Sequence, residues 1–133
     1  MLSFTPFPLE EGVPIYVQIV RHVKGGIVSG SVQDGDELPS RRVLSALLGV
    51  NPNTIQKAYR ILEDDGLIQS HSGAKSYVSA TPEQRERIRA QLLTEDVRRL
   101  VHTLRQSGVP KEEAIALVDQ LWNEEDAAEE ESS

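Results

Sequence analysis

Five polar side chains in the segment 53–60 are of the types that contact DNA bases and phosphates. They lie outside the apolar face of an expected helix: Asn53, Thr54, Gln56, Lys57 and Arg60. Asn and Gln can each form two hydrogen bonds with adenine, and Thr offers a base both a hydroxyl and a methyl group. Lys and Arg suit phosphates, as do the backbone amides at a helix N-terminus. Taken alone, such a polar face is usually only solvated surface, so its meaning depends on the neighbouring elements.

Two arginines lie at the start of the preceding expected helix. Arg41 and Arg42 follow Ser40, which can cap that helix. One of them could reach a guanine edge or a phosphate. Cations at a helix start are disfavoured by the positive end of the helix macrodipole. This cost favours a functional role for the two arginines. A salt bridge to Asp36 or Glu37 explains the pair equally well.

The spacing of apolar residues predicts the elements that position these side chains. Helical spacing predicts helices over 14–29, 41–48 and 52–65, and a short turn over 49–51 joins the last two. The period then changes to about two, which predicts strands over 67–71 and 76–79. The loop between them holds Gly73, small enough to approach a minor groove, and Lys75, an anchoring charge. Three helices followed by a hairpin are the order of a winged helix-turn-helix domain, in which the third helix enters the major groove.

Two further expectations concern the inward face of the second helix and a glycine pair in the first. In the helix over 41–48, the residues expected to face inward are Val43, Leu44, Leu47 and Leu48. In the first helix, the pair Gly25-Gly26 conflicts with helical propensity, since each Gly costs roughly 1 kcal/mol relative to Ala. The pair therefore marks either a kink or a close helix contact.

A second pair of helices follows the hairpin. Thr81, Pro82 and Gln84 match a capping box, which predicts a helix from 82 to about 107, and Pro110 opens a last helix. Two such helices cannot close a core alone, so their apolar stripes need the winged domain, a second chain or both. The simplest expectation is an isologous dimer. The dimer contacts are expected from the apolar stripes of both helices: Leu93, Val97, Leu100, Leu104, Ile115, Val118, Leu121 and Trp122.

These segments predict a mainly α chain with a small β-hairpin. We expect an N-terminal arm over 1–13, the winged helix-turn-helix domain over 14–80, and a two-helix dimerisation segment over 81–123. Residues 124–133 are expected to form a disordered acidic tail. The net charge of −7 resides mostly outside the winged domain, because residues 14–80 hold seven basic and six acidic side chains.

Composition argues against several classes of protein. The 133 residues include no cysteine, and His22, His71 and His102 lie far apart, so we expect no metal and no cofactor, and we interpret the histidines as structural or surface residues. No apolar run approaches the ~20 residues of a membrane span. The N-terminal sequence lacks the basic region of a signal peptide. We therefore expect a soluble, cytoplasmic protein without a membrane partner.

Residues 14–80 resemble the winged domain of GntR-type bacterial transcription regulators. The resemblance rests on the motifs PIYVQI (14–19), DGDELPSRRVLSALLGVNPNT (34–54) and QKAYRILEDDGLI (56–68). The short two-helix C-terminal segment resembles that of the YtrA subfamily. Members are generally dimeric repressors whose genes often neighbour ABC-transporter genes.

The resemblance implies a set of DNA contacts. The family's arginine on the second helix falls on Arg42, its recognition-helix contacts on Asn51, Asn53, Thr54 and Gln56, and its wing glycine on Gly73. The wing departs from the family pattern, because Lys75 replaces a second glycine and His71 and Ser72 replace arginines. Lys75 can substitute for the missing charge.

We therefore expect a sequence-specific, dimeric regulator that binds double-stranded DNA, represses transcription and recognises a palindromic operator. The alternative is a winged-helix module that binds a protein and never DNA, which the acidic tail favours slightly. An enzyme is disfavoured, because no nucleophile–base arrangement, metal cluster or phosphate loop is visible. A small-molecule effector is an open expectation, and residues 81–133 contain no recognisable ligand motif.

Overall fold

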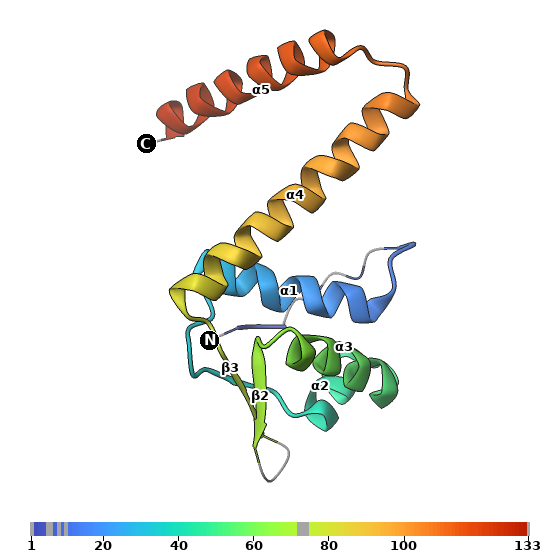
Figure 1. The fold of residues 1–133 in the computed structure, drawn as a ribbon, viewed down its shortest axis with the longest axis vertical. Helices are drawn as coiled ribbons and strands as arrows, with labels where there is room; N and C mark the ends of the chain where they lie inside the picture. Colours follow the sequence, from blue (N-terminus) through green and yellow to red (C-terminus); the bar gives the residue numbers. More distant parts are fainter. Residues whose placement is uncertain (1, 5–6, 8, 10, 72–74, 133) are drawn as a thin grey trace. The chain divides into compact units, whose positions relative to one another are not determined.

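The computed structural model describes residues 2–4, 7, 9, 11–71 and 75–132. Over these residues the chain is mainly helical with a small antiparallel sheet, as expected (Figure 1). The elements in order are α1 (Ile15–Ser29), β1 (Glu37–Leu38), α2 (Arg41–Leu48), α3 (Pro52–Asp64), β2 (Ile68–His71), β3 (Lys75–Val78), α4 (Pro82–Gln106) and α5 (Lys111–Ser132).

The chain divides into two compact units, Met1–Leu92 and Leu93–Ser133. The boundary lies later than the expected one at residue 80, because the first turns of α4 belong to the first core. Ile88 is fully buried there, and Leu92 packs against the same core. The winged domain therefore includes the start of the helix that follows it.

The core of the first unit is built on α3. This helix packs against both α1 and α2 (Figure 1). The exposure of its side chains confirms the expected inner face. The side chains of that face are fully buried: Ile55, Ala58, Tyr59 and Leu62. Because residues three and four apart share one side of a helix, the burial of this face leaves the opposite face of α3 exposed.

The expected inner face of α2 is wrong at two positions. Leu44 is buried, but Val43 and Leu47 are 57% and 52% exposed. The buried face of α2 is turned instead toward Ser45, whose hydroxyl donates a hydrogen bond to the Val50 carbonyl oxygen at 2.6 Å. An eight-residue helix that packs on one neighbour buries only a narrow stripe, so two of the four apolar positions remain at the surface.

The wing is a three-stranded antiparallel sheet in the order β1-β3-β2. The register pairs Ile68 with Val78 and His71 with Lys75 in β2 and β3, the two expected strands. The third strand, β1, pairs Leu38 with Ser76 and was not expected, because two residues are too short to show a periodicity. It places the chain that leads into α2 on the edge of the wing.

Helix α1 continues through Gly25 and Gly26, and the second glycine allows a close contact. A Cβ atom on Gly26 would lie 2.7 Å from Val32 Cγ2 and 2.9 Å from Leu2 Cδ1, whereas one on Gly25 would meet nothing within 4 Å. Of the two explanations that the sequence allowed, the structure favours the close contact, which is with the segment after the helix and with the N-terminal arm.

The two glycines are expected to respond to alanine in opposite ways. Gly26→Ala should lower the free energy of unfolding by about 1–3 kcal/mol, because Val32 is fully buried and cannot move away. Gly25→Ala should raise it by about 0.5–1 kcal/mol, since alanine loses less backbone entropy in a helix. Urea denaturation of both variants measures these changes, and equal effects of one sign would contradict the close contact.

Helix α4 begins at the expected capping box. The Thr81 hydroxyl accepts from the Gln84 backbone N–H at 3.2 Å, and the Gln84 side chain accepts from the Thr81 backbone N–H at 2.9 Å. The chain reverses after α4 at Gly108, which has a φ of 72°. No helix within the described residues combines the length and the apolar character of a membrane span.

The acidic segment does not form the expected disordered tail. Residues 124–132 continue α5 as helix to Ser132. The segment is rich in Glu and Ala, which have high helix propensity, and extending an existing helix avoids the cost of nucleation.

Candidate nucleic-acid interface

Helices α2 and α3 form a helix-turn-helix with a tight connection. Gly49 ends α2 with a φ of 67°, a left-handed conformation that glycine adopts without strain. Both expected caps are confirmed. The Ser40 hydroxyl accepts from the Val43 N–H at 3.1 Å, and the Asn51 side-chain oxygen accepts from the Asn53 N–H at 2.8 Å. The Ser40 hydroxyl proton and the Asn51 amide N–H groups are still donors that DNA could use.

The outward face of α3 carries the expected polar set. Asn53, Gln56, Lys57 and Arg60 are exposed, and Thr54 is half-buried. The Lys57 ammonium lies 4.0 Å from the centre of the Tyr16 ring, a cation–π contact with α1. This contact places the end of the Lys57 side chain beside α1.

The helix-turn-helix is basic although the chain is acidic. Residues 38–62 contain four basic side chains and no Asp or Glu, whereas the whole chain has a net charge of −7. Arg42, Lys57 and Arg60 are all exposed on α2 and α3. The acidic side chains of α3, Glu63 and Asp64, lie in its last turn, so a polyanion could approach the start of α3 without meeting one of them.

Arg41 and Arg42 have different environments. Arg42 is exposed. The Arg41 Nη2 atom lies 2.8 Å from Glu63 Oε1, and its guanidinium carbon lies 5.3 Å from the centre of the Tyr59 ring. The sequence suggested Asp36 or Glu37 as the partner of this pair, and the structure corrects it to Glu63. Arg41 ties α2 to α3, and Arg42 is the arginine that faces solvent.

Glu63 also joins the wing to the helix-turn-helix. The same Oε1 atom accepts a hydrogen bond from the Ser70 hydroxyl on β2, and Ser70 Oγ lies 3.5 Å from Ser76 Oγ on β3. Sequence reasoning missed this residue. Spacing within one helix does not reveal a contact that depends on two helices and a strand coming together.

Tyr59 anchors the residue that precedes α2. Its hydroxyl is buried and donates to the Pro39 carbonyl oxygen at 2.6 Å. Burial raises the pKa of Tyr59 strongly, and the nearby positive charge of Arg41 only partly opposes this shift. The phenol therefore stays protonated in the folded state at a pH where an unfolded tyrosine ionises.

This pKa shift predicts an alkaline loss of stability. The free energy of unfolding should fall as the pH rises above about 10, because the unfolded state then releases the Tyr59 proton and the folded state retains it. Tyr59→Phe should remove this component and lower stability at neutral pH by about 0.5–1.5 kcal/mol, since the Pro39 carbonyl loses its donor. Urea denaturation from pH 8 to 11 measures both. The same alkaline decline in wild type and variant would contradict the assignment.

The structure describes one of the two candidate residues of the wing. Lys75 is exposed at the start of β3, opposite His71, whose ring packs edge-on against Tyr77 at 5.0 Å. Gly73 lies outside the described residues. Within the described part of the chain, no group of three His, Cys, Asp or Glu side chains could hold a metal ion.

The second unit presents an apolar groove of about 480 Å³ between α4 and α5. Six of the eight residues expected at a dimer contact line it, together with Val101, Lys111, Ala114 and Asp119: Val97, Leu100, Leu104, Ile115, Val118 and Trp122. Leu121 lines an adjoining depression with Val118 and Trp122, and Leu93 lies outside both. Trp122 is 69% exposed, so it is not a core residue of the single chain.

The packed helix-turn-helix and the adjoining three-stranded wing define a winged helix-turn-helix protein. Residues 15–78 match the family described as "Bacterial regulatory proteins, gntR family". The chain belongs to this GntR family and, within it, to the YtrA-like group. It is therefore a DNA-binding transcriptional regulator of this family.

Three relatives illustrate the match. The chain is 42% identical over 66 residues to the HTH-type transcriptional repressor YtrA of Bacillus subtilis, covering 50% of this chain and 51% of YtrA, about half of its length. It is 30% identical over 102 residues to the uncharacterized HTH-type transcriptional regulator YhcF of the same organism, covering 77% and 84%. A GntR family transcriptional regulator from Listeria monocytogenes has a similar structure, with a TM-score of 0.72 and 32% identity, covering 84% and 98%.

Proposed function

We propose that the protein is a homodimeric repressor that recognises a palindromic operator. The observation that carries this proposal is the outward face of residues 38–62, which displays side chains of the types that read bases and bind phosphates and carries no Asp or Glu. The repressor YtrA, 42% identical over the winged segment, supports repression as the outcome of binding. Control of an ABC-transporter operon is the gene context that the YtrA-like resemblance suggests.

In this proposal α3 enters the major groove with its N-terminal residues first. Asn53, Thr54 and Gln56 read bases, Arg42 contacts a guanine edge, and Lys57 and Arg60 bind phosphates. Ser40, Arg41 and Asn51 lie at the two helix starts, where Arg41 supports the surface through Glu63. Gly73 and Lys75 contact the flanking minor groove.

The second copy pairs through α4 and α5. Most of the large apolar side chains that the described chain exposes lie in the second unit, between Leu93 and Trp122. A surface of this kind marks an interaction site. A two-fold axis between two such chains would place two recognition helices on half-sites of an inverted repeat.

A binding selection on fragmented genomic DNA from the source organism tests the proposal. We expect one inverted repeat to be enriched, and anisotropy over a salt series should show affinity that falls steeply as salt rises. Enrichment of direct or single half-sites would overturn the palindrome. Enrichment that occurs only after a small-molecule extract is added would indicate that binding requires an effector.

A further inference from the structure

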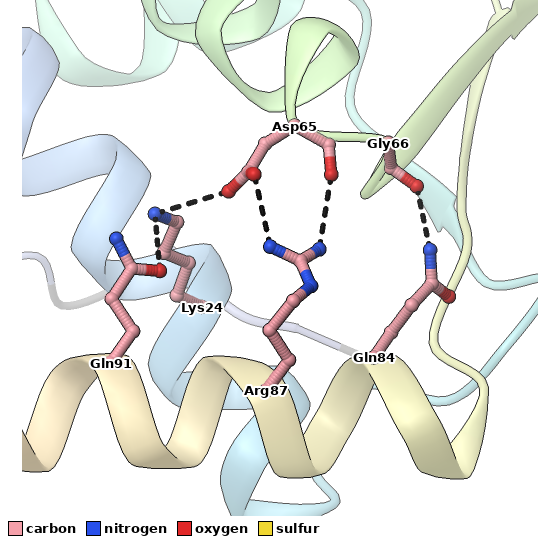
Figure 2. Close-up of polar contacts among 6 residues, drawn as sticks. All are labelled: Lys24, Asp65, Gly66, Gln84, Arg87 and Gln91. Atoms are coloured by element: carbon pink, nitrogen blue, oxygen red, sulfur yellow. Dashed lines mark hydrogen bonds and ion pairs between the residues drawn. The ribbon is translucent and has the colours of Figure 1, made fainter.

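A polar cluster joins the end of α3 to the first turns of α4. Figure 2 shows Asp65 between two cations from different helices. Its Oδ2 atom lies 3.3 Å from Lys24 Nζ on α1, and its Oδ1 atom lies 3.1 Å from Arg87 Nη1 on α4. Arg87 Nη2 also donates to the Asp65 carbonyl oxygen at 3.1 Å. Two glutamines of α4 complete the cluster: Gln84 donates to the Gly66 carbonyl oxygen at 2.9 Å, and Gln91 accepts from Lys24 at 3.2 Å.

Helix propensity does not explain the acid at this position. Asp65 caps the C-terminal end of α3, where the helix macrodipole is negative and disfavours a carboxylate. The Lys24 side chain is 9% exposed and that of Asp65 is 31% exposed, so the ion pair that compensates Asp65 is partly desolvated. Such pairs add little net stability compared with apolar packing, but they require a defined geometry of their partners. The bidentate contact of Arg87 adds a second directional constraint.

We propose that Asp65 is a positioning residue that holds α4 in one orientation on the end of the recognition helix and thereby selects the spacing of operator half-sites. Helix α4 continues without a break from this cluster to Gln106, and so enters the second unit through which two chains are proposed to pair. The polar contacts at its start therefore act on the element that links the two units. This inference rests on the proposed dimeric, operator-binding function.

The spacing preference of the full-length protein tests this role. Anisotropy is measured on the selected operator and on versions with one base pair inserted or removed between the half-sites. The wild type is expected to lose on the order of 10²-fold affinity on the altered spacings, because only one half-site is then engaged. Asp65→Asn and the milder Arg87→Gln should reduce that loss to below about tenfold, because a loosened α4 can adapt to either spacing.

Arg89→Gln is the matched control. Arg89 lies two residues beyond Arg87 on the same helix, and its partner Glu86 is 70% exposed, so the pair lies on the solvent side. This variant should retain the full spacing preference. A merely structural role of Asp65 would lower the affinity for all spacings alike, and that result in a folded Arg87→Gln protein would overturn the proposal.

A second measurement needs no DNA. The chain contains no cysteine, so Ala46→Cys on α2 and Ala90→Cys on α4, both at exposed positions, accept a spin-label pair. Diluting labelled chains with unlabelled ones isolates the distance within one chain. We expect a narrow distance distribution in wild type and in Arg89→Gln, and a broad one in Arg87→Gln. Narrow distance distributions in all three proteins would overturn the proposal. A broad distribution in Arg87→Gln, together with a wild type that binds no palindrome, would mean that only the proposed function is wrong.

Discussion

Val118→Glu is expected to convert the protein from a dimer into a monomer and to weaken operator binding by on the order of 10²–10⁴-fold. Val118 lies on α5 and lines the apolar groove between α4 and α5, where it is 46% exposed in the single chain. A carboxylate at this position would have to be desolvated in the dimer, which costs several kcal/mol. Binding would then depend on one half-site. Sedimentation velocity and anisotropy measure the two effects.

Ala116→Glu is the matched control for this change. Ala116 is exposed on α5 and lies outside the groove, so the substitution adds the same charge to the same helix. It should leave both the dimer and operator binding intact. If Val118→Glu remains dimeric, the groove is not the interface. If it becomes monomeric and still binds the operator with wild-type affinity, the two half-sites are not engaged together.

Arg42→Ala is expected to cost about 1–3 kcal/mol of operator binding and to relax the preference at one base pair in each half-site. Arg42 is exposed at the start of α2, in a segment, residues 38–62, that contains no acidic side chain. An arginine that hydrogen-bonds a guanine edge discriminates between bases, so its loss changes specificity as well as affinity. Selection from a randomised operator library, combined with anisotropy, separates these two effects.

Two neighbouring substitutions sharpen this test. Lys57→Ala should weaken binding to every sequence alike and reduce the salt dependence by about one counterion, as expected for a phosphate contact. Arg41→Ala should lower the stability of the domain, since Arg41 pairs with Glu63, and should leave the base preference of the folded protein unchanged. A uniform loss of binding in Arg42→Ala as well would refute its assignment to base reading.

Local chemistry allowed much of the winged domain to be predicted from the sequence. The caps at Ser40 and Asn51 and the capping box at Thr81 lie where the residue types indicated. The buried face of α3 is also as expected, because a strict helical spacing of apolar residues leaves one face to bury. These features depend on neighbours within four residues along the chain, which is the range over which sequence patterns are informative.

Contacts between elements decided the remainder. The partner of Arg41, the exposure of Val43 and the close approach of Val32 to Gly26 each depend on how separate segments meet in space. The two-residue strand β1 exists because β3 offers it an edge, and no local propensity of Glu37 and Leu38 foretells it. The acidic end of the chain differs from its expected disorder for another reason. Its charge suggested disorder, but the helix propensity of its residues and the preceding turns of α5 favour continuation of that helix.

The sequence by itself determined the family, the order of the helices and of the two hairpin strands, and the polar face of the recognition helix, because motif spacing and periodicity record these directly. Only the tertiary structure decided which of two adjacent arginines faces solvent and which binds Glu63. It also brought Lys24, Asp65 and Arg87 together from three helices. Pairing of charges over such sequence distances follows from the packing of α1, α3 and α4, and packing is a property of the whole core rather than of any segment.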